Sequence, residues 1–183
     1  MIIAQEEPGC DTLRVPVLKV FDGDGFLTSL GPRRIAVRFG FTDAPEIEQP
    51  GGQEAKAFLS SLIFDRWVEL VVLFKSDTGR FVDRHGRIVA VPYLSDESAL
   101  GAMRNVELEM VLNGWSWVLD RYEPGEHYLD ALADARRHRR GIWALEDNVH
   151  PWDFKREKYR NRPKINGNPQ LNLFSDNPRG QSF

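Results

Sequence analysis

The stretch that decides the fold is Phe21-Asp22-Gly23-Asp24-Gly25-Phe26, which a short apolar and turn segment joins to Val37-Arg38-Phe39-Gly40-Phe41-Thr42-Asp43-Ala44-Pro45-Glu46. Its acidic residues and its arginine stand at the ends of predicted strands, beside glycine and proline. Loops at strand ends are where a β scaffold presents chemistry, because they can point side chains into a shared cleft. Asp-Gly-Asp is also a common turn sequence, so the meaning of this motif depends on the residues downstream of it.

Around this stretch the residue pattern predicts an α+β fold in which one helix interrupts a run of strands. Strands are predicted from β-branched and apolar runs at Leu13–Val20, Phe26–Leu30, Arg34–Phe41, Trp67–Phe74 and Arg87–Leu94. Helical spacing of apolar residues predicts a helix over Gln53–Phe64, and two more helices are expected at Asn105–Leu112 and Glu126–Arg140. Short strands of this number favour a small barrel over a parallel sheet.

Composition and charge limit the function classes. The single cysteine, Cys10, excludes an internal disulfide. No apolar run is long enough to cross a membrane, and the first residues lack the basic and apolar regions of a signal peptide. We therefore expect no membrane partner, a monomer, and a cytoplasmic protein unless a leader has been removed.

The net charge of −3 is unevenly distributed along the chain. Residues 1–135 are acidic overall, which argues against tight non-specific binding of long nucleic acid. Residues 136–183 are basic and could supply phosphate contacts, or could form a solvated basic helix and tail. We expect a flexible N-terminus over residues 1–12, one domain over 13–150, and a basic, then disordered, extension over 151–183.

The order of motifs resembles the staphylococcal nuclease (thermonuclease-like) domain family. The resemblance covers about residues 13–145, with matching pieces at Val20–Asp24, Val37–Phe39, Asp43–Glu46, Gln53–Leu59, Asp83–Arg87, Val106–Trp115 and Arg139–Trp143. It implies a five-stranded OB-type β-barrel with three helices, and a Ca²⁺-dependent nuclease that hydrolyses phosphodiester bonds of DNA and RNA.

The resemblance also implies roles for particular residues. Asp24, Asp43 and the backbone carbonyl of Ala44 match the family's metal ligands. Glu46 matches the residue that orients or deprotonates the attacking water, and Arg38 and Arg87 match the two phosphate-binding arginines. Tyr122 and His85 stand near positions where the family has substrate-contacting aromatic residues.

Several positions depart from the family pattern. Gly25 and Ala44 stand where the family usually has threonine, although a backbone carbonyl at position 44 survives that change. Asp120 replaces one of two common tyrosines, and Leu132 replaces a common glutamate. Loss of the two hydroxyls would loosen hydrogen bonds around the metal ligands, so these departures bear on affinity and activity more than on the reaction class.

The chemistry needs residues of these types. Hard oxygen ligands bind Ca²⁺, which acts as a Lewis acid on a phosphate oxygen. Arginine donates paired N–H groups to phosphate oxygens as charge develops on them, which lysine cannot reproduce. Glu46 could hold or deprotonate water if it lies within hydrogen-bond reach.

Other interpretations of these residues remain open. Asp43 before Ala-Pro could cap a turn, and Arg38 could pair with Asp43 rather than with phosphate. Trp152 and Phe154, set among basic residues, could form a nucleic-acid platform or dock onto the barrel. The whole domain could also be an OB-fold module that binds nucleic acid or protein with weak or no catalysis.

Overall fold

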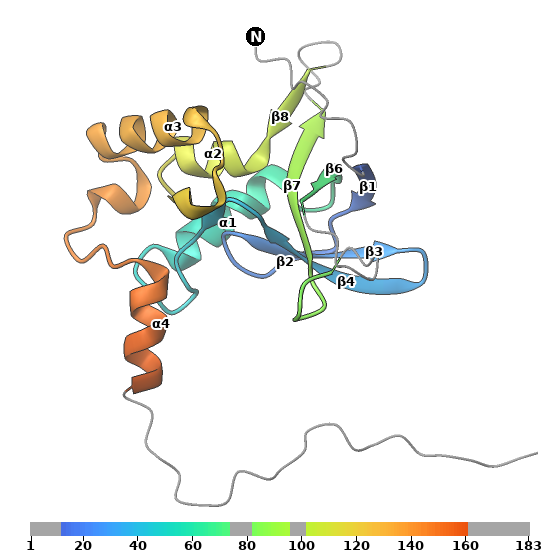
Figure 1. Ribbon diagram of the computed structural model, residues 1–183, viewed down its shortest axis with the longest axis horizontal. Coiled ribbons are helices and arrows are strands. Elements are labelled where there is room, and N and C mark those ends of the chain that lie inside the picture. The colour runs from blue at the N-terminus through green and yellow to red at the C-terminus, as the bar shows by residue number, and fades with distance from the viewer. Residues whose placement is uncertain (1–11, 74–81, 96–101, 161–183) are drawn as a thin grey trace, which may run out of the picture.

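The computed structural model describes residues 12–73, 82–95 and 102–160. Its fold is mixed α+β, as predicted, with the strands on one side of the view and helices α1 to α3 gathered on the other (Figure 1). The strands are β1 Thr12–Pro16, β2 Lys19–Val20, β3 Gly25–Leu30, β4 Arg33–Phe39, β5 Thr42–Asp43, β6 Trp67–Val72, β7 Ile88–Ser95, β8 Met103–Asn105 and β9 Trp117–Val118. The helices are α1 Gly52–Ile63, α2 Val106–Leu112, α3 Glu126–Arg137 and α4 Pro151–Arg160, with short 3₁₀ turns η1 Asp120–Tyr122 and η2 Gly141–Ala144.

The main sheet runs in the order β1-β6-β7-β4-β3-β2, with β8 beside β7. Its pairs are antiparallel except for β4 and β7, and β5 and β9 form a separate antiparallel pair. The predicted strand over residues 13–20 is divided into β1 and β2, which lie at opposite ends of this order. The strand ladder is not closed, so the predicted five-stranded barrel is not confirmed, whereas the α+β class is.

The core lies between the sheet and α1. Every fourth residue of α1 (Ala55, Leu59 and Ile63) is buried, so the apolar spacing predicted the helix correctly. Strand β4 buries Val37 and Phe39 in the same core, while the side chain between them points to the other face. That alternation places the Arg38 side chain on the face of the sheet that points away from this core.

Helices α2 and α3 complete the domain. The Asn105 side chain caps α2 by accepting a hydrogen bond from the Leu108 N–H at 3.0 Å. The predicted stop after α2 is confirmed, because Gly114 has a left-handed φ of 75°. Helix α3 packs against α2 and ends at Arg137, three residues earlier than predicted.

The three predicted helices are present as α1, α2 and α3, but the described residues contain a fourth, α4, which was not predicted. It begins at Pro151, and proline is favoured in the first turn of a helix because its missing N–H would have no helical partner there. The predicted basic extension therefore starts as a helix (Figure 1). The predicted disordered tail and all but Thr12 of the predicted flexible N-terminus lie outside the described residues.

Candidate active site

A close approach of two chain segments positions Asp24. A Cβ atom on Gly23 would lie 2.6 Å from the Cβ of Ala44 and 2.9 Å from that of Ala55, so only glycine lets this turn press against them. The Ala44 N–H then donates a hydrogen bond to Asp24 Oδ2 at 2.8 Å. The Asp24 N–H donates to Asp22 Oδ1 at 3.2 Å, which fixes the turn.

Arg38 joins the two predicted metal carboxylates. Its Nη1 lies 3.3 Å from Asp24 Oδ2, and its Nη2 donates to Asp43 Oδ1 at 2.8 Å. Nη1 also donates to the backbone carbonyls of Phe39 at 3.0 Å and Thr42 at 2.8 Å. Asp24, Arg38 and Asp43, here called the acid–arginine cluster, therefore come from the turn before β3, from β4 and from β5.

The cluster is buried and short of positive charge. Asp24 is 7% exposed and Asp43 8% exposed. Burial, and then the charge of Asp24, raise the pKa of Asp43 to about 6 despite the opposing charge of Arg38. Burial lowers the pKa of Arg38, but the neighbouring carboxylates outweigh this and raise it, so the guanidinium stays charged. Burial and the charge of Asp24 raise the pKa of the neighbouring Asp22 to about 7. These three acids outnumber Arg38, although the charge of Lys155 also acts on Asp43.

The donor set of the cluster fits Ca²⁺. Within the described ranges, Asp43 Oδ2 accepts no hydrogen bond, whereas Asp24 shares a side-chain hydrogen bond with Asp22 besides the one from the Ala44 N–H. Those ranges contain no group of three or more His, Cys, Asp or Glu side chains arranged for a metal. An ion here would therefore be held by two carboxylates, with backbone and water oxygens completing a coordination shell that Ca²⁺ accepts.

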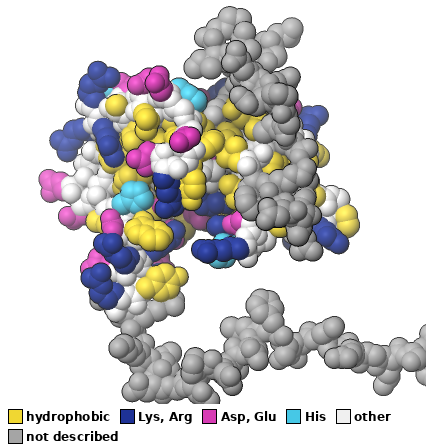
Figure 2. Space-filling view, viewed as in Figure 1, with side chains coloured by type: hydrophobic (Ala, Val, Ile, Leu, Met, Phe, Trp, Pro, Cys, Tyr) yellow, Lys and Arg dark blue, Asp and Glu magenta, His cyan; other side chains and the backbone are white. Residues whose placement is uncertain are grey.

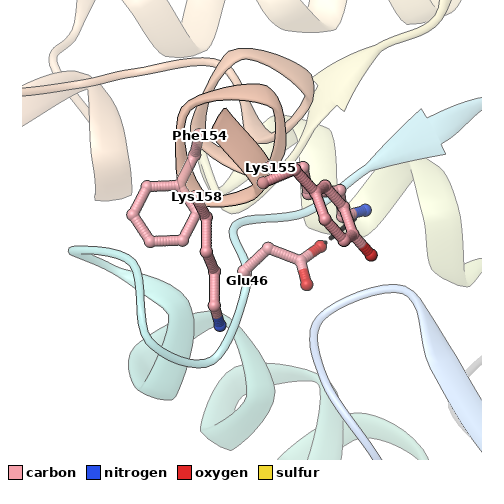
Figure 3. A pocket seen from close by; sticks show the side chains of 5 residues that line it. Glu46, Phe154, Lys155 and Lys158 are labelled. Carbon is pink, nitrogen blue, oxygen red and sulfur yellow. Dashed lines mark ion pairs between the residues drawn. The ribbon is translucent and has the colours of Figure 1, made fainter. Parts of the chain in front are cut away.

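Glu46 lies on the loop between β5 and α1, beside the cluster. Its N–H donates to the side-chain oxygen of buried Gln49 at 3.2 Å. Its carboxylate pairs with Lys155 of α4 at 2.7 Å, as Figure 3 shows. The charges of Glu46 and Asp24 both act on the pKa of Asp43, so the three acids share one electrostatic environment.

Arg87 immediately precedes β7, which pairs with the strand that carries Arg38. In the parallel β4–β7 ladder Val37 pairs with Ile88 and Arg38 with Val89. Arg87 comes just before Ile88 and therefore lies next to the end of β7 that pairs with Val37 and Arg38. The structure pairs Arg87 with Asp83, through Nε at 3.1 Å and Nη2 at 2.9 Å, rather than with the cluster.

The two predicted substrate-binding residues are exposed and lie in other loops. His85 accepts a hydrogen bond from Arg84 Nε at 3.1 Å. Tyr122 lies in η1 with the Arg121 guanidinium 4.8 Å from its ring. Among the described residues neither contacts the acid–arginine cluster, so their roles remain predictions.

Residues 36–145 match the sequence profile of the family described as staphylococcal nuclease homologue. This chain belongs to that family. The resemblance predicted from the motifs is thereby confirmed, and family membership supports nuclease activity in general.

Several relatives of this chain carry nuclease names. It is 34% identical over 144 residues to a protein of Haemophilus influenzae named an uncharacterized endonuclease, covering 78% of this chain and 72% of that one. It is 28% identical over 160 residues to a micrococcal nuclease of Shigella flexneri, covering 85% and 88%. An uncharacterized endonuclease of Escherichia coli is 28% identical over 149 residues, covering 81% of this chain and 89% of that one.

Among the described residues of this chain, no helix has the length and apolar character needed to cross a membrane.

Two residues beside the acid–arginine cluster, Asp22 and Lys155, were not predicted from the sequence. Asp22 was given no role, although Asp-Gly-Asp placed it next to Asp24, and its carboxylate braces the turn. Lys155 was missed because α4 was not predicted. The Pro151 start and the alternation of basic and aromatic residues were the signals that could have revealed it.

Proposed function

We propose that the chain is a calcium-dependent nuclease that hydrolyses phosphodiester bonds of DNA and RNA with low sequence specificity. The observation that carries this proposal is the acid–arginine cluster, in which Asp24 and Asp43 from separate segments meet at one guanidinium. The motif resemblance matches these positions to the family's metal ligands, and together with Asp22 the acids outnumber Arg38. A divalent cation would supply that charge and act on the phosphate as a Lewis acid.

We also propose that the main sheet closes into the five-stranded OB-type barrel. It is supported by the linker between β1 and β2, the strands at the two ends of the ladder. The Val17 N–H bonds to the carbonyl of Arg66, and the Leu18 N–H to that of Leu27, both at 2.8 Å. The linker thus bonds toward both ends of the sheet, as closure requires.

Each polar group has a separate task in this proposal. Asp24, Asp43 and the Ala44 carbonyl would hold Ca²⁺. Glu46 accepts a hydrogen bond from the attacking water and orients it, taking its proton if it serves as the base. Arg38 on β4 and Arg87 just before β7 donate N–H groups to the phosphate oxygens as their charge rises. A guanidinium has five N–H donors, and Arg87 uses two of them on Asp83.

Tyr122 and His85 would contact the nucleotide in this proposal. Both side chains are exposed, and rings available to solvent can stack on bases.

The test is degradation of plasmid DNA and of RNA with Ca²⁺ or with a chelator. We expect cleavage only with Ca²⁺, and a loss of roughly 10²–10³ in kcat for Arg87→Ala, the size seen when one charge-stabilising donor is removed. Glu46→Gln should also be impaired, whereas Glu54→Gln, an exposed substitution in the first turn of α1, should cleave like the parent. Cleavage that persists with chelator would contradict the proposal.

A binding module is the second candidate function. Its support is that both predicted phosphate-binding arginines already pair with acids, Arg38 in the cluster and Arg87 with Asp83. Salt-dependent nucleic-acid binding without cleavage, unchanged by Asp24→Asn, would favour the module over the nuclease.

A further inference from the structure

Helix α4 forms a pocket against the loop that carries Glu46. This α4 pocket, of about 130 Å³, is lined by Glu46, Phe154, Lys155, Lys158 and Tyr159. Figure 3 shows Phe154, Lys155 and Lys158 projecting from α4 on the side of that loop. The water-orienting residue of the proposed reaction is thus also part of the pocket wall.

Several contacts fix α4 in this place. Lys155 pairs with Glu46 at 2.7 Å, and Lys158 pairs with Glu48 on the same loop. Just before the helix, the His150 ring packs on Trp117 with 5.4 Å between ring centroids. The Gln49 side chain, whose oxygen accepts the Glu46 N–H, also donates to the carbonyl of Val149. The pocket is therefore tied to the loop at the active site.

The lining combines apolar rings with cationic groups. Figure 2 shows lysine and arginine side chains together with apolar rings over α4. Tyr159 is 67% exposed, so much of its ring surface faces solvent. Aromatic rings that stack bases, set beside cations that contact the backbone, are how proteins hold single-stranded nucleic acid.

The size of the pocket suits part of a polymer. It is smaller than the roughly 300–1,000 Å³ of pockets that enclose a whole drug-sized ligand. A nucleic-acid strand needs only to place one ring or phosphate there, while the rest of the strand continues to the acid–arginine cluster. The lysines' present partners do not prevent this, because exposed ion pairs are weak and a phosphate can displace a glutamate.

We propose that the α4 pocket binds one nucleotide of a single-stranded segment of the substrate, beside the scissile phosphodiester. The base stacks on Tyr159 and Phe154, and its phosphate contacts Lys158. This inference rests on the proposed function for the placement of the strand. It adds a contact surface outside the part of the chain that matches the family, which ends at residue 145.

Fluorescence anisotropy with a labelled oligothymidine, measured in chelator so that no cleavage occurs, tests the charge contact. Lys158→Gln should weaken binding several-fold and reduce the slope of log affinity against log salt by about 0.7, the value for one phosphate contact on a single strand. The matched control is Arg156→Gln, which removes the same charge from the same helix outside the pocket. Equal slopes for the two variants would overturn the proposal.

The stacking contact is tested with the same probe. Tyr159→Leu should weaken binding by roughly fivefold or more, with the salt slope unchanged, because stacking on an aromatic ring is lost without a change in charge. Trp152→Leu is the matched control, since Trp152 is 61% exposed on the same helix but does not line the pocket. Tyr159→Leu binding like the parent, in a variant whose circular dichroism melt is unchanged, would also overturn the proposal.

Failure of this proposal and failure of the nuclease assignment are distinguishable. If Lys158→Gln and Tyr159→Leu bind like their controls while the parent cleaves DNA with Ca²⁺, the nuclease stands and the α4 pocket is rejected. If both variants lose affinity but the parent never cleaves, the pocket stands as a nucleic-acid site on a binding module.

Discussion

Glu107 is a fully buried carboxylate that holds the chain between the two halves of the acid–arginine cluster. It lies on α2 with 0% exposure. Its Oε1 accepts the Gly40 N–H at 2.6 Å, and its Oε2 accepts the Phe41 N–H at 3.3 Å and the Tyr128 O–H at 3.3 Å. Gly40 and Phe41 form the bend between β4 and β5, so Glu107 fixes the path from Arg38 to Asp43.

The pKa of Glu107 predicts how stability changes with pH. Burial raises its pKa from 4.5 to about 8, against the two backbone N–H groups, which lower it. Because the folded state holds the proton more tightly than the unfolded state, this group's stabilising contribution is fully present below pH 4.5. It is lost as the pH rises through about 8. At 1.36 kcal/mol for each pKa unit, the total change is on the order of 5 kcal/mol.

Urea denaturation of the parent and of Glu107→Gln between about pH 5 and pH 8 measures this change. Glutamine keeps the shape of the side chain but does not titrate, so the parent should lose several kcal/mol of unfolding free energy relative to the variant across this range. Glu109→Gln, on the same helix but partly exposed and paired with Arg104, should follow the parent. A parent–variant difference that stays constant with pH would refute the reasoning.

Three further substitutions test the supporting structure through urea denaturation. Gly114 has a φ of +75°, and a Cβ there would lie 2.2 Å from the carbonyl oxygen of Arg140, so Gly114→Ala should lower the unfolding free energy by more than the roughly 1–3 kcal/mol that a strained φ costs alone. Gly31→Ala, at a φ of +57° with no atom within 4 Å of the added Cβ, should cost less. Equal losses for the two variants would contradict the predicted clash at Gly114. Thr28→Val should cost about 1 kcal/mol, because its buried hydroxyl donates to a β1 carbonyl at 2.7 Å; an unchanged midpoint would show that this bond adds nothing. Asn105→Ala should cost about 1 kcal/mol or more, because it removes both the α2 cap and the hydrogen bond from Asn105 Nδ2 to the Tyr128 hydroxyl oxygen. Asn105→Asp keeps only the cap and should cost less; equal losses would show that the cap adds nothing.

The elements with strong periodicity were predictable from sequence. Helix α1 shows its buried stripe at Ala55, Leu59 and Ile63, and β4 alternates Val37 and Phe39 with Arg38. These patterns reflect burial of one face, which local sequence encodes directly. The short pairs β5–β9 and β7–β8 were not predicted, because two- and three-residue strands carry almost no periodic signal.

The partners of the charged residues were less predictable. Sequence left open whether Arg38 would meet phosphate or Asp43, and the structure shows it between Asp43 and Asp24. The pairing of Glu46 with Lys155 joins residues more than a hundred positions apart, and no local pattern specifies such a contact. Motif order predicted the set of acids and arginines, but the distances within that set depend on how the strands pair.

Burial divides the site into two parts with different tolerance to change. Asp24, Arg38 and Asp43 are mutually paired and shielded, so removing one partner leaves an uncompensated charge that costs about 3–5 kcal/mol. Chemistry and folding are therefore coupled in the cluster. The pairs made by Lys155 and Lys158 are partly exposed and each contribute at most about 1 kcal/mol. If α4 holds a strand as proposed, changes on α4 would alter how that strand is held while the cluster remains intact, and substrate preference could vary without loss of the proposed reaction.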